Sequence, residues 1–340
     1  MYPNVSIIVL NWNGWEDTVE CLESLYQIDY PNYNVIVVDN GSQDNSIQKI
    51  KDYCQGKLEI ESDLFEIDVK KPIKIFEYFN DDIKDISSDL NLIQTLNSHE
   101  KLILIKNDDN YGFAEGNNIG MRFVLKNFDS NYLLLLNNDT VVKKDFLSKL
   151  VDLSANDAHI GICGPKVLYY HQPHVINSAG GKIVWHMGLG INKGIGERDE
   201  GQYDAISETD SLLGACILIN SDVIRKCGLL DHQFFLLLEE TDFCIRAKKA
   251  GYKIFFNPQA VIYHKEGISG EISPLKYYYM YRNRLFIIRK HQTPIKVLLY
   301  SLIVSLRTLF IIIYFAAKGD KNVLKSIFYG YLDGIHEKIT

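Results

Sequence analysis

The sequence lacks paired cysteines. Its six cysteines are scattered over 340 residues without a single C-x-x-C pair. Such spacing disfavours a disulfide framework or a cysteine-rich zinc site and is typical of buried thiols in a reducing compartment. An excess of positive charge is also missing, because the formal net charge is -7. We therefore expect no general nucleic-acid-binding face, although local basic patches remain possible.

The sequence also shows no targeting segment ahead of its first strand-like run, residues 5–10. No charged stretch followed by an apolar one precedes that run, so we expect no secretory signal peptide. The length permits a large core, either in one α/β domain with an appendage or in two domains.

The first half of the chain alternates apolar, β-branched runs with amphipathic segments. The runs expected to form strands are 5–10, 33–38, 101–105 and 132–136, and the segments expected to form helices are 15–28, 42–53 and 114–126. Continuous apolar strands separated by helices predict an α/β fold with a mostly parallel sheet flanked by helices. In such sheets ligands bind at the carboxyl ends of the strands.

Two stretches interrupt this rhythm. Residues 56–100 are acidic and partly alternating, which predicts an inserted hairpin and helix, most simply a surface elaboration without a catalytic role. Residues 160–200 are rich in glycine and irregular in pattern. A Gly-x-Gly spacing at 188–194 is not followed by a helix with a buried face, so we expect hairpins and loops there and no dinucleotide fingerprint.

Polar loops follow each of the four expected strands. They read Asn11-Trp12-Asn13-Gly14, 39–46 (DNGSQDNS), 107–118 (NDDNYGFAEGNN) and 137–140 (NNDT). Turn and helix-cap chemistry alone accounts for any one of them. Together they would meet at one edge of the sheet, where Asp39 could accept hydrogen bonds from a ribose or base, and Asp139 offers the oxygen ligand that Mg²⁺ or Mn²⁺ prefers.

An apolar run leads directly into a tight acidic cluster, Glu239, Glu240 and Asp242. Carboxylates beside one another and against a hydrophobic wall can be tuned as a general base. The alternative is an acidic helix N-terminus, where the helix dipole favours negative charge.

These motifs, in this order, resemble family 2 glycosyltransferases of the GT-A fold, in particular their rhamnosyltransferase-like branch. The resemblance covers roughly residues 4–290 outside the insertion and rests on the strand–loop motifs above together with Gly214-Ala215-Cys216, the 239–242 cluster and Tyr263-His264. It implies a catalytic domain over residues 1–270 and C-terminal helices over 271–340.

The resemblance also implies roles for individual residues. The nucleotide-sugar site would comprise Leu10, Asn11, Trp12, Asp39, Asn40, Ser42, Asn110, Gly112, Ala114, Asn117 and Asn138. Asp139 and His264 would hold Mn²⁺ or Mg²⁺, with Asn137 in place of the leading Asp of the family's metal motif. Gly214 and Ala215 would face the acceptor. The catalytic group would come from Glu240, Glu239 and Asp242, with Glu240 aligned to the family's base.

The implied activity is inverting transfer of a sugar from a dTDP- or UDP-linked donor to a hydroxyl of a glycan or lipid-linked acceptor. Two other functions stay open on the residues alone. A nucleotidyltransferase would want a basic loop after the first strand, and residues 11–17 contain neither Lys nor Arg. A non-catalytic protein that binds nucleotide sugars or glycans would tolerate the missing metal Asp.

The C-terminal part combines an aromatic and basic stretch, 276–291, with a long apolar stretch, 297–317. Arg307 in its middle and a polar stripe of Ser301, Ser305 and Thr308 predict an amphipathic helix lying in the membrane surface more than a spanning helix. A core helix or a homodimer contact would give the same pattern. We therefore expect a cytoplasmic enzyme, peripheral or monotopic on the inner face of the cell membrane.

Overall fold

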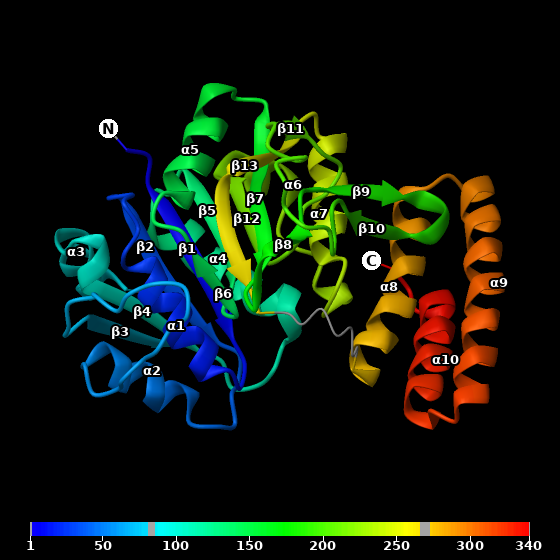
Figure 1. Ribbon diagram of the computed structural model, residues 1–340, viewed down its shortest axis with the longest axis horizontal. Coiled ribbons are helices and arrows are strands. Elements are labelled where there is room, and N and C mark those ends of the chain that lie inside the picture. The colour runs from blue at the N-terminus through cyan, green and yellow to red at the C-terminus, as the bar shows by residue number, and fades with distance from the viewer. Residues whose placement is uncertain (1, 81–85, 266–272, 340) are drawn as a thin grey trace.

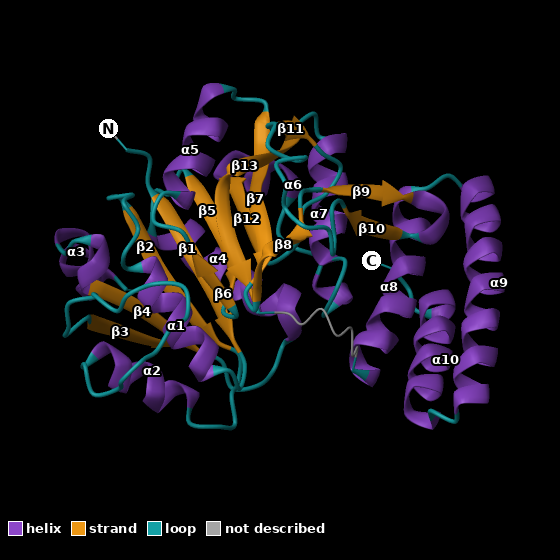
Figure 2. Ribbon diagram, in the orientation of Figure 1, coloured by secondary structure: helices purple, strands orange, loops and turns teal. Residues whose placement is uncertain are grey.

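The computed structural model describes residues 2–80, 86–265 and 273–339. Its centre is a twisted mixed sheet, with a group of three C-terminal helices at one side (Figures 1 and 2). The sheet has the strand order β11-β13-β7-β12-β5-β1-β2-β4-β3, with β6 paired to β13 and β8 paired to β7. A separate two-stranded ribbon joins β9 and β10.

The parallel half of the sheet forms where apolar runs predict it. Its strands are β1 (Val5–Asn11), β2 (Tyr33–Asp39), β3 (Lys74–Phe79), β4 (Lys101–Lys106) and β5 (Tyr132–Asn137). All residues of β1 and β2 are buried, as expected for strands covered on both faces. The register pairs Leu10 with Asn137 and Asn11 with Asp39, so the polar loops that follow these strands lie side by side.

The second half of the sheet is mixed in direction. It contains β6 (Thr140–Val142), β7 (Ile160–Tyr169), β8 (Gln172–Ser178), β11 (Ser207–Glu208), β12 (Cys216–Asn220) and β13 (Lys253–His264). The ribbon is formed by β9 (Gly181–Val184) and β10 (Leu189–Asn192) around the short helix η3 (Trp185–Met187). The expected hairpins of this region are confirmed, whereas β7, a fully buried strand, falls in a stretch whose sequence looks irregular.

Helices cover both faces of the sheet. One hydrophobic core joins it to α1 (Trp15–Leu25), α2 (Ser46–Cys54) and α5 (Phe146–Asn156). The opposite core joins it to α3 (Ser87–Thr95), α4 (Gly112–Asn127), α6 (Ser221–Cys227) and α7 (Glu239–Lys249). This three-layer α/β arrangement is the predicted fold class. The stretch 56–100 differs from the expected hairpin, because β3 is an edge strand parallel to β4.

The C-terminal residues form three helices, α8 (Pro274–His291), α9 (Pro294–Lys318) and α10 (Lys321–His336). Figure 1 shows α8 nearest the sheet and α9 on the outside. Among the described residues, α9 alone is long and apolar enough to cross a membrane, and only 11% of its most apolar window is buried. A solvent-facing helix of this composition exposes an apolar surface that water does not favour.

Candidate active site

A cavity of about 590 Å³ lies between the end of the parallel sheet and the C-terminal helices. Its wall is built from the loop after β5, the β10 ribbon, residues 211–215, the segment 236–241, the end of β13 and the first turns of α8. Glu239, Glu240, Asp139 and His264 all line it. The structure therefore brings the expected acidic pair and the expected metal ligands to one hollow.

The two glutamates at the start of α7 differ in their surroundings. Glu239 is 3% exposed and its Oε2 has no hydrogen-bond partner. Burial, followed by the charge of Glu240, raises the pKa of Glu239 well above its ordinary value. Burial also raises the pKa of Glu240, but hydrogen bonds oppose that rise, including one at 2.8 Å from the Thr241 hydroxyl to Glu240 Oε1. The interaction between the two carboxyl groups raises the pKa of Glu239 and lowers that of Glu240, so Glu239 keeps a proton more readily than Glu240 does.

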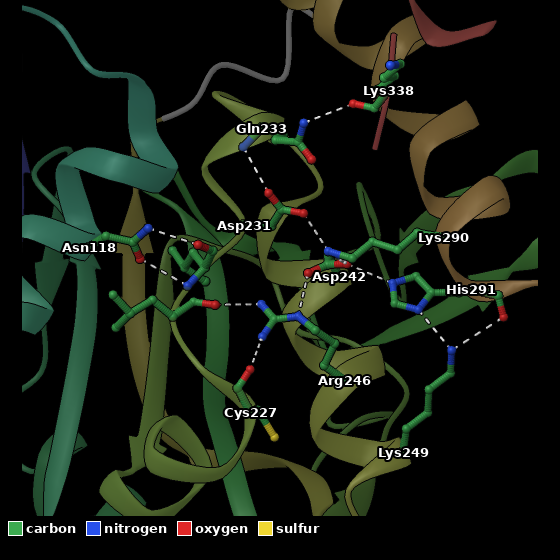
Figure 3. A network of polar contacts seen from close by, with 12 residues as sticks. Asn118, Cys227, Asp231, Gln233, Asp242, Arg246, Lys249, Lys290, His291 and Lys338 are labelled. Carbon is green, nitrogen blue, oxygen red and sulfur yellow. Dashed lines mark hydrogen bonds and ion pairs between the residues drawn. The ribbon is translucent and has the colours of Figure 1, made fainter. Parts of the chain in front are cut away.

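Asp242, the third acidic residue of the cluster, lies outside the cavity wall. Its Oδ2 accepts a hydrogen bond of 2.7 Å from Arg246 Nε, and its Oδ1 lies 2.7 Å from His291 Nε2 and 3.0 Å from Lys290 Nζ (Figure 3). Burial would raise its pKa, but the bond to His291 and the charges of Arg246 and Lys290 lower the pKa of Asp242 to about 2. This carboxylate joins α7 to the end of α8 and has no free oxygen directed at a substrate.

The loop that leads into the glutamate pair has an unusual backbone. Phe235, Leu237 and Leu238 have φ values of 59°, 71° and 71°, a region that residues with a side chain rarely adopt. The fully buried Asn283 of α8 holds this loop, because its Nδ2 donates to the carbonyl oxygens of Phe234, Leu236 and Leu237 at 2.9, 2.8 and 2.7 Å. The C-terminal helices thus set the position of the catalytic candidates.

The same loop contacts the start of α4. Gly112 has φ +79°, and a Cβ there would lie 2.5 Å from the Phe235 ring. The Phe235 carbonyl accepts hydrogen bonds from the amides of Phe113 and Ala114 at 2.6 and 3.2 Å. The backbone of the Gly112 loop and the loop before Glu239 are therefore packed as one unit, with Phe235 stacked on Tyr279 of α8 at 5.0 Å.

Asp139 and His264 meet because β6 pairs with β13, which places Thr140 opposite His264. His264 Nε2 lies 3.2 Å from Asp139 Oδ1, and His264 Nδ1 lies 3.1 Å from the Asn177 amide oxygen. Burial raises the pKa of Asp139, but the charge of His264 and the hydrogen bond to it bring the pKa below its ordinary value.

The donor set of this corner suits a divalent cation. Since an amide oxygen only accepts, Nδ1 of His264 carries a proton toward Asn177, and Nε2 donates its proton to the Asp139 carboxylate. Loss of the Nε2 proton would make that nitrogen a metal ligand beside Asp139. The buried Asn137 Oδ1 accepts no hydrogen bond, and Asp139 Oδ1 has no donor beside His264. An imidazole nitrogen and two oxygens fit Mn²⁺ or Mg²⁺. In the described part of the chain, no group of three or more His, Cys, Asp or Glu side chains is arranged for a metal. Further ligands would have to come from substrate.

The residues expected to bind the nucleotide form two hydrogen-bonded groups, and none of them is among the residues that line the cavity. Asn11 Nδ2 donates to Asp39 at 2.7 Å and to Ser42 at 3.1 Å. Asn40 Nδ2 donates to Asn110 Oδ1 at 2.9 Å, and Asn40 also contacts Gly112 and Asn107. These bonds fix the loops after β1, β2 and β4 to one another.

The other expected members occupy varied positions. Trp12 is 50% exposed and offers an open ring face. Asn138 Nδ2 donates to Gly14 O and to Thr18 at 3.1 and 3.0 Å, while Asn117 Nδ2 bonds within its own helix. Leu10 and Ala114 are buried and pack in the core below the loops. Within the nucleotide-site set, the side chains mainly shape the loops, and Trp12 is the most open.

Gly214 and Ala215, the expected acceptor-side residues, line the cavity opposite the base candidate. A Cβ on Gly214 would lie 3.7–3.9 Å from the Glu240 side chain. Sequence reasoning missed the α8 contribution of Lys276, Met280 and Asn283. In the sequence these residues stand only in an aromatic and basic stretch, 276–291, and such a stretch is equally typical of a segment at a membrane surface.

The fold is shared with solved glycosyltransferases. The mannosyltransferase PcManGT from Pyrobaculum calidifontis, solved in complex with GDP-Man and Mn²⁺, aligns over 100% of this chain and 89% of its own, with TM-score 0.56 and 12% identity. GalNAc-T7, solved with UDP, GalNAc and Mn²⁺, aligns over 81% of this chain and 46% of its own, with TM-score 0.54 and 15% identity. At these identities the likeness shows the GT-A fold.

Sequence relatives are named glycosyltransferases. The dTDP-rhamnosyl transferase RfbF of Shigella flexneri is 24% identical over 74% of this chain and 85% of its own length. The low-salt glycan biosynthesis hexosyltransferase Agl10 of Haloferax volcanii is 26% identical over 46% of this chain, and the match spans only half of that relative. The rhamnosyltransferase WbbL of Escherichia coli K12 is 29% identical over 44% of this chain and 58% of its own length.

The fold is thus that of the GT-A glycosyltransferases. Residues 6–67 match the family described as Glycosyl transferase family 2, and residues 132–329 match Glycosyl transferase family group 2. The chain belongs to the family 2 glycosyltransferases. The family prediction from the sequence is confirmed, which sets aside the nucleotidyltransferase and the non-catalytic binding protein.

Proposed function

We propose that the protein transfers a sugar, with inversion, from a dTDP- or UDP-linked donor to a hydroxyl of a glycan or lipid-linked acceptor. One observation carries the proposal: Glu240 lies on the cavity wall next to Gly214, and Asp139 and His264 line the same cavity. A base and a cation-binding corner in one hollow are what a single displacement at an anomeric carbon requires.

In this proposal Glu240 accepts the proton of the acceptor hydroxyl as that oxygen attacks. Glu239 stays protonated and donates to Glu240, which keeps the carboxylate form available near neutral pH. The loops after β1, β2 and β4 bind the nucleoside, with Trp12 as a stacking face. Asn283 fixes the approach of the base through the 234–237 carbonyls.

Asp139, His264 and the Asn137 amide oxygen would hold Mn²⁺ or Mg²⁺ together with the donor diphosphate. When bound, the cation would supply positive charge to the leaving diphosphate. Relatives with this fold were solved with Mn²⁺, which supports a divalent ion here.

We also propose that the enzyme works at the inner face of the cell membrane. Ile295, Leu298 and Phe310 of α9 are 82%, 75% and 70% exposed, so this helix presents an apolar face to its surroundings. Lys318, Lys321 and Lys325 follow it and suit an anionic leaflet. Such a face would be covered by the acyl region next to a lipid-linked acceptor.

Nucleotide binding tests the donor site directly. Thermal unfolding would be followed with UDP, dTDP, GDP and CMP, each with and without Mn²⁺ or Mg²⁺. A ligand at one hundred times its Kd stabilises the fold by about 2.7 kcal/mol. We expect UDP or dTDP to stabilise the protein, more so with metal.

Two histidine variants separate the metal corner from general effects. His264→Gln should lose the metal-dependent part of the stabilisation and keep the metal-free part. The control His159→Gln changes a side chain that is 74% exposed and should behave as the wild type. A folded protein that responds to none of the nucleotides would contradict the proposed donor site.

A further inference from the structure

Helix α8 carries a buried arginine without a counter-charge. Arg284 is 7% exposed, and its buried Nε has no hydrogen-bond partner. The guanidinium lies over the Tyr281 ring at 4.3 Å. Within the described ranges, no carboxylate forms an ion pair with Arg284. An uncompensated buried charge is costly, so a protein that keeps one commonly uses it.

A second arginine reinforces this positive charge. Arg307 projects from the middle of α9, and no ion pair to it occurs among the described residues either. Burial, and to a smaller extent the like charge of Arg307, lower the pKa of Arg284, while Tyr281 opposes that fall. Two cations brought within electrostatic reach of each other repel, unless an anion joins them.

Thr308 adds an unused hydroxyl at the same level of the helices. It is 2% exposed, and its buried Oγ1 has no hydrogen-bond partner. Along α9, Thr308 lies between Val304 and Ile311. Val304 shares a hydrophobic cluster with Leu285 of α8, and Ile311 shares another with Tyr281 of α8. The hydroxyl is therefore at the height of the buried arginine, which lies between those two residues of α8.

The face of α9 next to this cluster is apolar and exposed. Leu306, Leu309 and Phe310 flank the Arg307–Thr308 pair and are 51%, 53% and 70% exposed. Guanidinium groups and a hydroxyl match the oxygens of a phosphate, whereas the neighbouring surface matches a hydrocarbon chain. One ligand meets both requirements, namely a phosphate group attached to a lipid.

We propose that Arg284, Arg307 and Thr308 form a binding site for the phosphate of a lipid whose chain lies along the exposed face of α9. The site is close to the cavity. Met280, which lines the cavity, precedes Arg284 by one helical turn, about 6 Å along the axis. The turn at Gly188, just before cavity residue Leu189, packs on the Arg284 backbone.

This position suits the phosphate of a lipid-linked acceptor whose sugar enters the cavity, a reading that rests on the proposed function. The lipid site itself does not depend on it. Phosphatidic acid and a polyprenyl phosphate share a phosphomonoester headgroup, so the experiment must separate them from each other and from free phosphate.

Vesicle binding of the full chain tests the site without any sugar nucleotide. The vesicles would contain phosphatidylcholine alone, or phosphatidylcholine with 5 mol% of phosphatidylserine, phosphatidic acid or a long-chain polyprenyl phosphate. We expect at least fivefold stronger retention on a phosphomonoester lipid than on phosphatidylcholine or phosphatidylserine. Whichever phosphomonoester lipid is retained more strongly identifies the source. Competition by inorganic phosphate alone at equal concentration would overturn the lipid assignment.

Variants locate the binding to these side chains. Arg307→Gln and Thr308→Val should remove the preference, and the control Lys296→Gln, on the same helix, should keep it. Arg284→Met should remove the preference without lowering the urea midpoint, because it eliminates an uncompensated charge. Equal losses in Lys296→Gln and Arg307→Gln, or a destabilised Arg284→Met that retains the preference, would overturn the proposal. If the protein binds the phosphomonoester vesicles but no nucleotide changes its thermal unfolding, the proposed donor site is contradicted and the lipid site is not.

Discussion

The clamp made by Asn283 gives the sharpest prediction about how this active site is held. Asn283→Leu keeps the size of the side chain and removes both amide donors. Phe234 O retains a bond from Arg282 at 2.9 Å, but Leu236 O and Leu237 O lose the donor that Asn283 supplies. At about 1–3 kcal/mol for each unsatisfied buried group, the variant should lose roughly 3 kcal/mol of stability.

The effect on catalysis should exceed the effect on stability. Without the clamp, the positive-φ backbone at Leu237 and Leu238 can relax, which displaces Glu240. A displacement of about 1 Å at a reacting group costs on the order of a hundredfold in rate. Urea unfolding followed by circular dichroism gives the stability, and nucleoside diphosphate release from the donor gives kcat.

Asn257→Leu is the matched control. Asn257 is also buried and away from the cavity, and it makes two bonds: its Nδ2 donates to Lys149 O at 2.9 Å, and its Oδ1 accepts from Gln259 N at 3.0 Å. It should lower stability to a similar degree and leave kcat within a few-fold of the wild type. If Asn283→Leu and Asn257→Leu have the same kcat, the clamp has no positioning role and this reasoning is refuted.

Two further predictions concern packing and pH. Gly112→Ala should destabilise the protein by roughly 2–3 kcal/mol in urea unfolding, because the new Cβ meets Phe235 in addition to the positive-φ cost. Gly228→Ala, at φ +78° with nothing within 4 Å, should cost about 1 kcal/mol, and equal costs would contradict the packing argument. Asp242, with its pKa lowered to about 2, should contribute about 2 kcal/mol of stability that is complete above pH 4 and lost as pH falls from about 4 to 2. Stability measured from pH 5 to pH 2 should fall more steeply in the wild type than in Asp242→Asn, and parallel curves would count against the ion-pair network of Figure 3.

Much of the fold follows from local sequence. The strands β1, β2, β4 and β5 appear as short apolar runs, because both faces of a parallel sheet are buried. Strand β7 was not predicted from the sequence, because Gly161, Gly164 and Pro165 interrupt its run of apolar residues. The structure explains the two glycines, where a Cβ would lie 2.7 Å from Val223 and Tyr252 or 2.9 Å from Leu212. Close packing of distant segments leaves no local signal.

The active site, like the fold, contains residues that the sequence predicts and residues that it does not. Asp139, His264 and the glutamate pair were predicted because each stands in a recognisable motif, and the structure places them around one cavity. The role of Asn283 was not predictable, because its partners lie 46–49 residues earlier in the chain. Likewise, the sequence placed Asp242 among catalytic candidates, whereas only its three-dimensional partners on α8 reveal a structural tie.

The most direct test of the account compares sugar transfer from the nucleotide-sugar donor by Glu240→Gln and Glu239→Gln. If Glu240 is the base, its amide variant should retain donor binding within a few-fold and lose turnover by about 10²–10⁴-fold. Glu239→Gln resembles the protonated acid that the structure favours and should stay within about tenfold of the wild type. Normal turnover by Glu240→Gln, or loss confined to Glu239→Gln, would contradict the assignment of Glu240 as the catalytic base.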